Sequence, residues 1–400
     1  MKMIVKLMAL VVLLSFIVGC APAAAPTEAP VAPEATEAPA APAATEVPAA
    51  PEVQDWAAIE AAAKEEGKVV VYASSSRIED QIEIWNQKYP DITLEGYDMG
   101  DIALKMVEEQ KSGNVVADVW FNSEGETLFG EVYPNGYVLP FVPDEFADTL
   151  ILSEDRPFPI QRYGGDAWGY NIEQNPEGCP IDNIWQVVDG TWDKKVYIED
   201  PLAESDKISY YVMMIQHGDE LAQAYLEQEG KEWTTDPDFG EDTPNAGWLW
   251  VKKFAKSPNL VLMPGGDEVT EAVASLGMTE PAGLALTSYS KVRDTAKGEI
   301  AFGVCQDVKP SNGTSSVTYL GIANNAPHPN AAKLYIRFAL TEEGREPWNV
   351  LGNWPGRTDL AAPEGAPPFS EAGLWPEDPV AIYEQASLVR DFWAINSLGQ

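Results

Sequence analysis

The chain has few cysteines and histidines and few positive charges. Its 400 residues include 3 Cys and 2 His, and 26 Lys and Arg stand against 63 Asp and Glu, a formal net charge of −37. This balance argues against a nucleic-acid partner, because binding to a phosphate backbone draws on clustered Lys and Arg. The cysteines fit no metal-ligand spacing. Cys179 and Cys305 are therefore expected to be either a disulfide of an exported protein or two separate buried thiols.

Motifs for catalysis are missing as well. The sequence contains no Gly-x-Ser-x-Gly elbow, Walker loop or Cys–His framework. His328 lies between two prolines at an expected helix start, where a structural role is expected. His217 ends an expected helix, and favourable charge at a helix C-terminus explains it as well as catalysis does. We therefore do not expect an enzyme.

The N-terminal apolar run, Leu7–Val18, is shorter than the roughly 20 residues that a membrane-spanning helix needs. Two lysines precede it and Gly19-Cys20 closes it, which is the layout of a secretory signal. Its ending resembles a bacterial lipobox. We expect residues 1–19 to be a lipoprotein signal peptide and lipid on Cys20 to anchor the chain outside the cytoplasmic membrane. An ordinary secretory peptide with an incidental cysteine is the alternative.

Residues 20–53 are expected to form a lipidated, disordered stalk. After Cys20 this segment contains only Ala, Pro, Thr, Glu and Val, a composition that cannot bury a core. Its prolines favour extended conformations, with a reach of at most roughly 100 Å from the membrane. A tail without a tethering role has the same composition and is the alternative if Cys20 carries no lipid.

The remaining residues, 54–400, are expected to fold as two α/β lobes. The chain is 45% hydrophobic and has 13 Trp, 15 Tyr and 12 Phe, enough large apolar side chains for extensive cores. Strand and helix patterns alternate from Gly67 onward. The expected strands are 69–73, 92–94, 115–121, 195–198, 260–263, 283–286, 300–304 and 317–322. The expected helices are 78–89, 102–110, 208–216 and 269–276, and residues 163–166 are expected to form a glycine-rich bend.

Four short segments carry a resemblance to a known family. They are 67–73 (GKVVVYA), 116–121 (VADVWF), 192–195 (WDKK) and 326–333 (APHPNAAK). With the lipobox and stalk they resemble the bacterial extracellular solute-binding proteins of ABC importers, in the group that includes ferric-iron binders. The resemblance implies a two-lobe periplasmic-binding-protein clamp of type II, each lobe a mostly parallel sheet flanked by helices.

The same resemblance implies no catalysis and delivery of a captured solute to a membrane permease. An extracytoplasmic sensory domain that presents its ligand to a receptor is the alternative, and we expect a monomer. Residues 54–160 with about 305–360 are expected to form one lobe. Residues of about 161–304 with C-terminal helices in 361–400 are expected to form the other.

The ligand is expected beyond the carboxyl ends of the parallel strands. Ser74, Ser75 and Ser76 follow the first strand beside Arg77, and hydroxyls and backbone N–H groups at a helix start suit a phosphate, sulfonate or carboxylate. Helix caps and turns are the alternative explanation of such residues. The predicted ligand-binding residues are Ser74, Ser75, Ser76, Arg77, Asn122, Ser123, Glu124, Asp166, Ser205, Gly266, Asp267, Ser288 and Tyr289. Tyr163, Trp168 and Phe121 are expected either to line the cleft or to belong to the core.

Ferric iron is the other candidate ligand. The resemblance implies a His or carboxylate after the first strand, a Glu after the third, and two adjacent tyrosines after strand 283–286. The chain offers Glu124 and Tyr289 as metal ligands, whereas the first loop has no His and Ser290 replaces the second tyrosine. The pair Tyr210-Tyr211 lies in an expected helix and is expected to pack in the core. The ligand is therefore open between Fe(III) and a small organic or phosphate-bearing anion.

Overall fold

The computed structural model describes residues 54–203 and 205–398, with the side chains of Ser205 and Asp206 left out. The predicted signal peptide (1–19), the lipid on Cys20 and the stalk (20–53) lie outside these residues. The described residues belong to one compact unit. Among the described helices, none is both long and apolar enough to cross a membrane.

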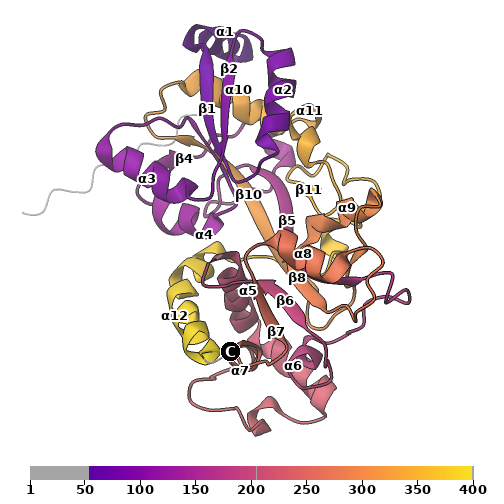
Figure 1. The fold of residues 1–400 in the computed structure, drawn as a ribbon. Coiled ribbons are helices and arrows are strands. Elements are labelled where there is room, and N and C mark those ends of the chain that lie inside the picture. Colours follow the sequence, from indigo (N-terminus) through magenta and orange to yellow (C-terminus); the bar gives the residue numbers. More distant parts are fainter. Residues whose placement is uncertain (1–53, 204, 399–400) are drawn as a thin grey trace, which may run out of the picture. The chain divides into compact units, whose positions relative to one another are not determined.

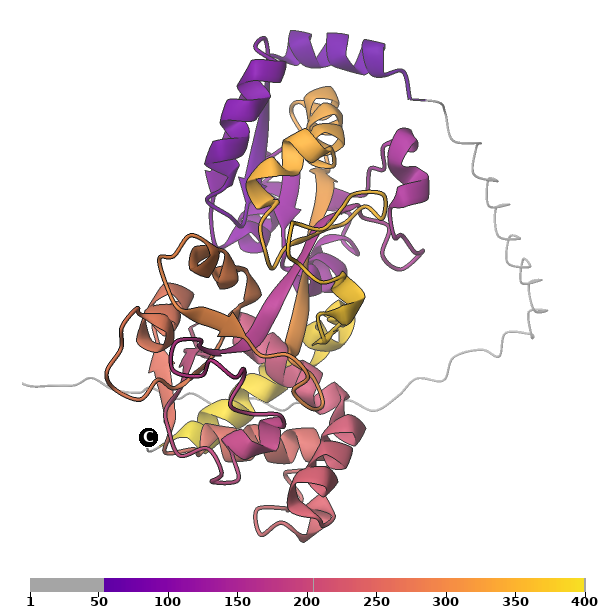
Figure 2. The ribbon, with the colours of Figure 1, turned by 90° about the vertical axis from the view of Figure 1, so that its right-hand side faces the viewer.

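The compact unit is an α/β fold built on one sheet, and Figures 1 and 2 show its two lobes joined by β5 and β10, which run side by side. The strands are β1 (Lys68–Ala73), β2 (Thr93–Asp98), β3 (Val119–Asn122), β4 (Val138–Leu139), β5 (Ile160–Asn171), β6 (Val196–Glu199), β7 (Leu260–Met263), β8 (Leu284–Ser288), β9 (Phe302–Val304), β10 (Gly313–Ala323), β11 (Trp354–Pro355) and β12 (Leu374–Trp375).

Helices cover both faces of this sheet (Figure 1). They are α1 (Trp56–Glu66), α2 (Ile78–Lys88), α3 (Ile102–Ser112), α4 (Gly125–Thr127), α5 (Ser205–Gln216), α6 (Gly218–Glu229), α7 (Ala246–Ala255), α8 (Gly266–Ala274), α9 (Val292–Ala296), α10 (Pro329–Ala339), α11 (Glu342–Arg345) and α12 (Pro379–Ser397). The C-terminal α12 contacts α5 and α7 of one lobe and α4 of the other, so it spans both lobes.

The strand order explains the two lobes. It is β2-β1-β3-β10-β5-β8-β6-β7, and the outer trios pair in parallel. The long central strands β10 and β5 are antiparallel to each other and to their other neighbours in this order. Parallel pairs place their carboxyl ends at one edge of the sheet, so the loops after β1, β3 and β8 can meet at one cleft.

The first strand shows why the sequence forms a sheet buried on both faces. Val69, Val71 and Ala73 belong to the core under α2 and α10, whereas Val70 and Tyr72 belong to the core on the α3 side. Because side chains alternate between the faces of a strand, a continuous apolar run fills both cores. The expected strand 69–73 is therefore confirmed.

One local prediction is wrong. Residues 163–166 are not a bend but part of β5, and each of the four pairs with a residue of β10. A Cβ on Gly165 would lie 2.3 Å from the Thr314 carbonyl oxygen, so the glycine permits close approach of two strands and not a turn.

The two cysteines and two histidines have structural partners. Cys179 and Cys305 form a disulfide, with Cα atoms 5.0 Å apart, which confirms the first alternative for this pair. His328 precedes α10, and its Nδ1 lies 2.8 Å from Asp118 Oδ2. His217 lies between α5 and α6, stacked on Trp375 at 4.2 Å between ring centroids. The structural reading of His328 is therefore confirmed, and His217 also has a structural place.

Candidate ligand-binding site

The serine loop after β1 forms one wall of a cavity of about 500 Å³. Ser74 N donates to the Phe121 carbonyl at 3.2 Å, which ties the loop to β3. Trp348 Nε1 donates to Ser75 Oγ at 3.1 Å. Arg77 is the residue preceding α2, and its guanidinium has no acceptor with which to cap that helix. The loop's side chains line the cavity, which favours the binding interpretation over helix capping.

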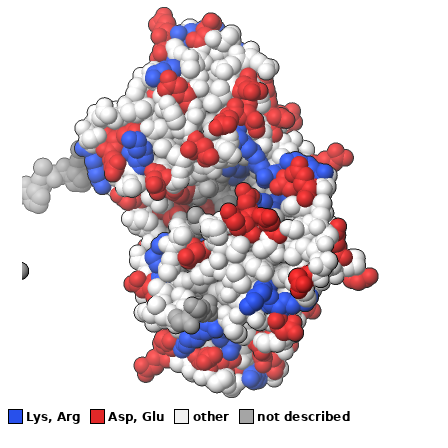
Figure 3. Space-filling view, viewed as in Figure 1, with Lys and Arg blue, Asp and Glu red and all other residues white. Residues whose placement is uncertain are grey.

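Three arginines line the same cavity. Arg77 follows the serines, Arg162 comes from β5, and Arg293 comes from α9 of the other lobe. The Arg162 guanidinium lies over the rings of Phe121 and Trp348, 5.5 and 5.3 Å from their centroids. Figure 3 shows Lys and Arg side chains at one side of the hollow between the lobes, with Asp and Glu both opposite and beside them.

The arginines are only partly compensated by protein carboxylates. Arg293 Nε lies 3.1 Å from Asp294 Oδ1. Over the described part of the chain, neither Arg77 nor Arg162 forms a salt bridge with a carboxylate. Burial, together with the charge of Arg77, lowers the pKa of Arg162 to about 9. Asp98 and Asp166 also line this cavity. Because buried cations are costly and Arg77 and Arg162 form no salt bridge with a described carboxylate, the cavity favours an anion.

Polar groups from the second lobe and a nearby loop complete the cationic cavity. Ser288 at the end of β8 and Ser290 bring their hydroxyl oxygens to 3.0 Å of each other. Arg293 Nη1 lies 3.3 Å from Ser290 Oγ. With its side-chain amide oriented to donate to the Gly352 carbonyl, Asn353 accepts from Arg77 Nη1 at 3.1 Å. The two lobes therefore both supply hydrogen-bonding groups to one site.

A second cavity, of about 280 Å³, continues the first. The two cavities share Ser74, Ser123, Asp166 and Ser316, so they are parts of one cleft. Asn122 at the end of β3 shapes this part, because its Oδ1 accepts from Ser123 N at 2.7 Å. Burial, with the neighbouring charge of Glu126, raises the pKa of Glu124 to about 7.

Asp166 lies where the two cavities meet, and its charge is countered from the second lobe. Lys207 of α5 has a side chain with 0% exposure, and its Nζ lies 2.5 Å from Asp166 Oδ2. The same Nζ lies 3.5 Å from Glu199 Oε1. This buried cluster holds β5 to the second lobe beside the cleft.

The structure brings nine of the predicted ligand-binding residues together and leaves three aside. Ser74, Ser75, Ser76, Arg77, Asn122, Ser123, Glu124, Asp166 and Ser288 line the two cavities. Gly266 and Asp267 line neither, and Asp267 instead pairs with Lys291 on the surface. The side chain of Ser205 lies outside the described residues.

The predicted metal ligands lie apart. Tyr289 is 6% exposed and belongs to a core cluster, where its hydroxyl accepts from Gln306 Nε2 at 3.4 Å. It does not line either cavity, whereas Glu124 does. Throughout residues 54–203 and 205–398, no three His, Cys, Asp or Glu side chains are grouped as a metal site. Tyr210 and Tyr211 are 2% and 0% exposed, which confirms that they pack in the core.

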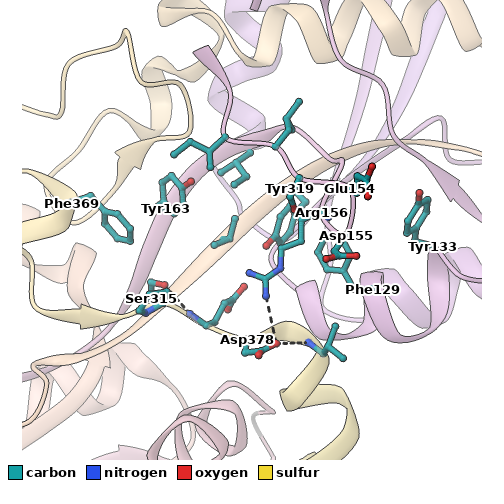
Figure 4. Close-up of a pocket in the computed structure, with 18 of the residues that line it drawn as sticks. Phe129, Tyr133, Glu154, Asp155, Arg156, Tyr163, Ser315, Tyr319, Phe369 and Asp378 are labelled. Atoms are coloured by element: carbon teal, nitrogen blue, oxygen red, sulfur yellow. Dashed lines mark hydrogen bonds and ion pairs between the residues drawn. The ribbon is translucent and has the colours of Figure 1, made fainter. Parts of the chain in front are cut away.

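The aromatic candidates lie outside the cleft. Phe121 and Trp168 are core residues with 1% and 0% exposure. Tyr163 lines a different cavity, and Figure 4 shows it facing Phe369, with which it stacks at 4.6 Å between centroids. Side chains of neighbouring residues in a strand point to opposite faces of the sheet. The side chain of Arg162 therefore lines the cleft, whereas that of Tyr163 lies on the opposite face of β5. The expectation that these three aromatic residues line the cleft is therefore wrong.

Several cleft residues escaped sequence reasoning. Arg162, Arg293, Ser316, Thr318, Trp348 and Asn353 all line the cationic cavity. Arg162 had a readable signal, because it is an ionisable residue inside a segment of apolar and small residues. The other five residues reach the cavity only through tertiary packing, and no local sequence pattern marks them.

The fold is that of the periplasmic substrate-binding proteins, as the sequence resemblance predicted. No protein-family model matches the chain, and no curated protein matches it by sequence. Iron-bound HitA from Pseudomonas aeruginosa superposes with a TM-score of 0.62 at 16% identity, covering 83% of this chain and 99% of that one. Fructose-6-phosphate-bound AfuA from Actinobacillus pleuropneumoniae gives 0.61 at 15% identity, covering 84% and 99%. Apo ferric ion-binding protein A from Pasteurella haemolytica gives 0.59 at 14%, covering 84% and 100%.

Proposed function

We propose that this protein captures a small organic anion, such as a phosphate ester, between its two lobes. The observation that carries the proposal is the convergence of Arg77, Arg162 and Arg293 on one cavity, the first two without a carboxylate partner in the described structure. An anionic ligand would supply the missing counter-charge through charge-assisted hydrogen bonds. Serine hydroxyls from both lobes add neutral donors.

Transport is the expected use of this capture. The similar solved structures include substrate-binding proteins of ABC transporters, and their names describe binding and no catalysis. We propose that the protein is held outside the cytoplasmic membrane by lipid on Cys20 and delivers its ligand to an ABC permease. Presentation of the ligand to a receptor is the alternative use of the same site. A permease gene beside this one would favour transport.

Fe(III) is the alternative ligand. Several of the similar structures are named as iron-bound or ferric-binding, and another is bound to fructose-6-phosphate. An anion accounts better for the arginines, which would repel a bare ferric ion. Of the two predicted metal ligands only Glu124 lines the cleft.

Calorimetric titration of the purified protein with phosphate, phosphate esters, carboxylates and ferric citrate tests the proposal. Arg77→Ala is expected to weaken anion binding by about 1.5–3 kcal/mol, roughly 10- to 100-fold, as for a charged hydrogen bond. Arg337→Ala is the matched control, because Arg337 pairs with Glu145 at 2.7 Å and lines neither cavity. Unchanged affinity in Arg77→Ala, or binding of ferric iron without any anion, would contradict anion capture.

A further inference from the structure

The smaller part of the cleft has an almost entirely polar lining. Of the twelve described residues that line it, six carry a hydroxyl, four carry a carboxyl, one is Asn122 and one is Gly100. It is called the acidic cavity below, because the four carboxyl groups are those of Glu124, Glu126, Asp166 and Glu377. An apolar part of a ligand would leave these polar groups without hydrogen bonds, which is costly once water is excluded.

Two buried polar atoms of this lining have no hydrogen-bond partner. Asn122 is 0% exposed, and its Oδ1 accepts from Ser123 N at 2.7 Å, so its Nδ2 is a donor without an acceptor. Glu377 Oε1 is likewise buried without a partner. It lies against the loop that follows Asn122, because a Cβ on Gly125 would be 3.2 Å from it. Unsatisfied buried polar atoms in natural proteins call for an explanation, and a bound ligand is one.

A hydroxyl is the ligand group that suits both atoms. Burial raises the pKa of Glu377 well above its ordinary range, which favours the uncharged carboxyl, a group with one donor and acceptor oxygens. A hydroxyl can accept from Asn122 Nδ2 and can either donate to Glu377 or accept from it. An ammonium has no acceptor for the amide. A second anionic group would find no Lys or Arg in the described lining of this cavity.

We propose that the ligand carries a hydroxyl group as well as its anionic group, with the hydroxyl beside Asn122 and Glu377 and the anion beside the three arginines. The inference rests on the proposed function and adds the chemical class of the solute, a hydroxylated organic anion. Ser74 and Ser123 line both cavities, so a short carbon chain between the two groups is enough to reach both.

A pair of ligands with the same carbon chain tests this inference. In 2,3-dihydroxypropyl phosphate two hydroxyls are added to propyl phosphate, and both esters carry the same phosphate. Calorimetric titration of the purified protein is expected to show the dihydroxy ester at least about fivefold tighter, the effect of one net hydrogen bond. Glu377→Leu is expected to reduce this ratio to about twofold or less, while propyl phosphate binding stays within about threefold of the parent.

Matched variants separate the possible outcomes. Glu377→Gln keeps an uncharged group with a donor and an acceptor at the same place, and should keep the ratio. Asn122→Leu removes the other unpartnered group and gives a second reading if Glu377→Leu does not fold. Equal affinity of the parent protein for the two esters, or a parental ratio in both leucine variants, would overturn the hydroxyl site and leave anion capture standing. Binding of neither ester, nor of inorganic phosphate, would overturn the proposed function itself.

Discussion

Replacing Arg162 with methionine is expected to weaken anion binding and yet stabilise the ligand-free protein. The pKa of this guanidinium falls from 12.5 to about 9 on folding, chiefly through burial. At 1.36 kcal/mol per pKa unit, the buried charge costs at most about 5 kcal/mol. The substitution also removes two ring contacts and the bond from Nη1 to Gln161 Oε1 at 2.9 Å, together about 2–4 kcal/mol.

The net gain in stability is therefore at most about 1–3 kcal/mol. Thermal unfolding would register it as a rise of about 1–4 °C, because an unfolding entropy of about 2.1 cal/mol/K per residue gives a unit of this length roughly 1.4 °C per kcal/mol. Calorimetry with propyl phosphate should show at least about a tenfold loss of affinity, since a charged hydrogen bond is lost.

Arg345→Met is the matched control for this experiment. Arg345 is 3% exposed, burial lowers its pKa, and its Nε and Nη2 have no partner, but it does not line the cleft. Arg345→Met should change the stability of the ligand-free protein but should not cause a comparable loss of affinity for propyl phosphate. A less stable Arg162→Met protein with parental affinity would refute the reasoning, because Arg162 would then serve folding and not the ligand.

Three further predictions concern the acidic cavity, the disulfide and the anchor. Glu124 has a folded pKa of about 7 against 4.5 in the unfolded chain, so the stability that it contributes is lost as pH rises through 7. Glu124→Gln should therefore gain up to about 3 kcal/mol over the parent at pH 8 but little at pH 4.5, and equal gains in thermal unfolding at both would contradict this. Reducing the disulfide Cys179–Cys305, whose cysteines are 126 positions apart, should cost about 2–5 kcal/mol in urea unfolding, whereas the double serine variant should not respond to reductant. Cys20→Ser should move the protein from the membrane to the soluble fraction on centrifugation, and continued attachment would rule out the lipid anchor.

Local patterns carried much of the fold prediction. The strand at 69–73 and the helix at 78–89 match β1 (Lys68–Ala73) and α2 (Ile78–Lys88) closely. Both signals are periodic and lie within a dozen residues, so they need no knowledge of distant contacts. The expected strand at 92–94 was too short, because β2 continues to Asp98 by pairing with β1. That extension depends on a neighbouring strand and not on the apolar pattern.

Strand β5 shows the opposite case. Two glycines in the middle of β5 look like a turn, yet β10 and β8 pair with the strand on both sides. The small residues serve the close approach of backbones, which a single sequence cannot distinguish from a bend. Because β5 was missed, Arg162 was missed with it.

The sequence by itself determined the alternation of strands and helices, the two-lobe α/β class and the serine loop with Arg77, because each depends on short-range periodicity or on residues next to one another. Only the tertiary structure decided that Arg162 and Arg293 line the same cavity as the serine loop and that Tyr289 is buried. It also separated the acidic part of the cleft from the cationic part. The physical reason is that charge compensation depends on distances between side chains from segments far apart in the sequence, which only the folded chain fixes.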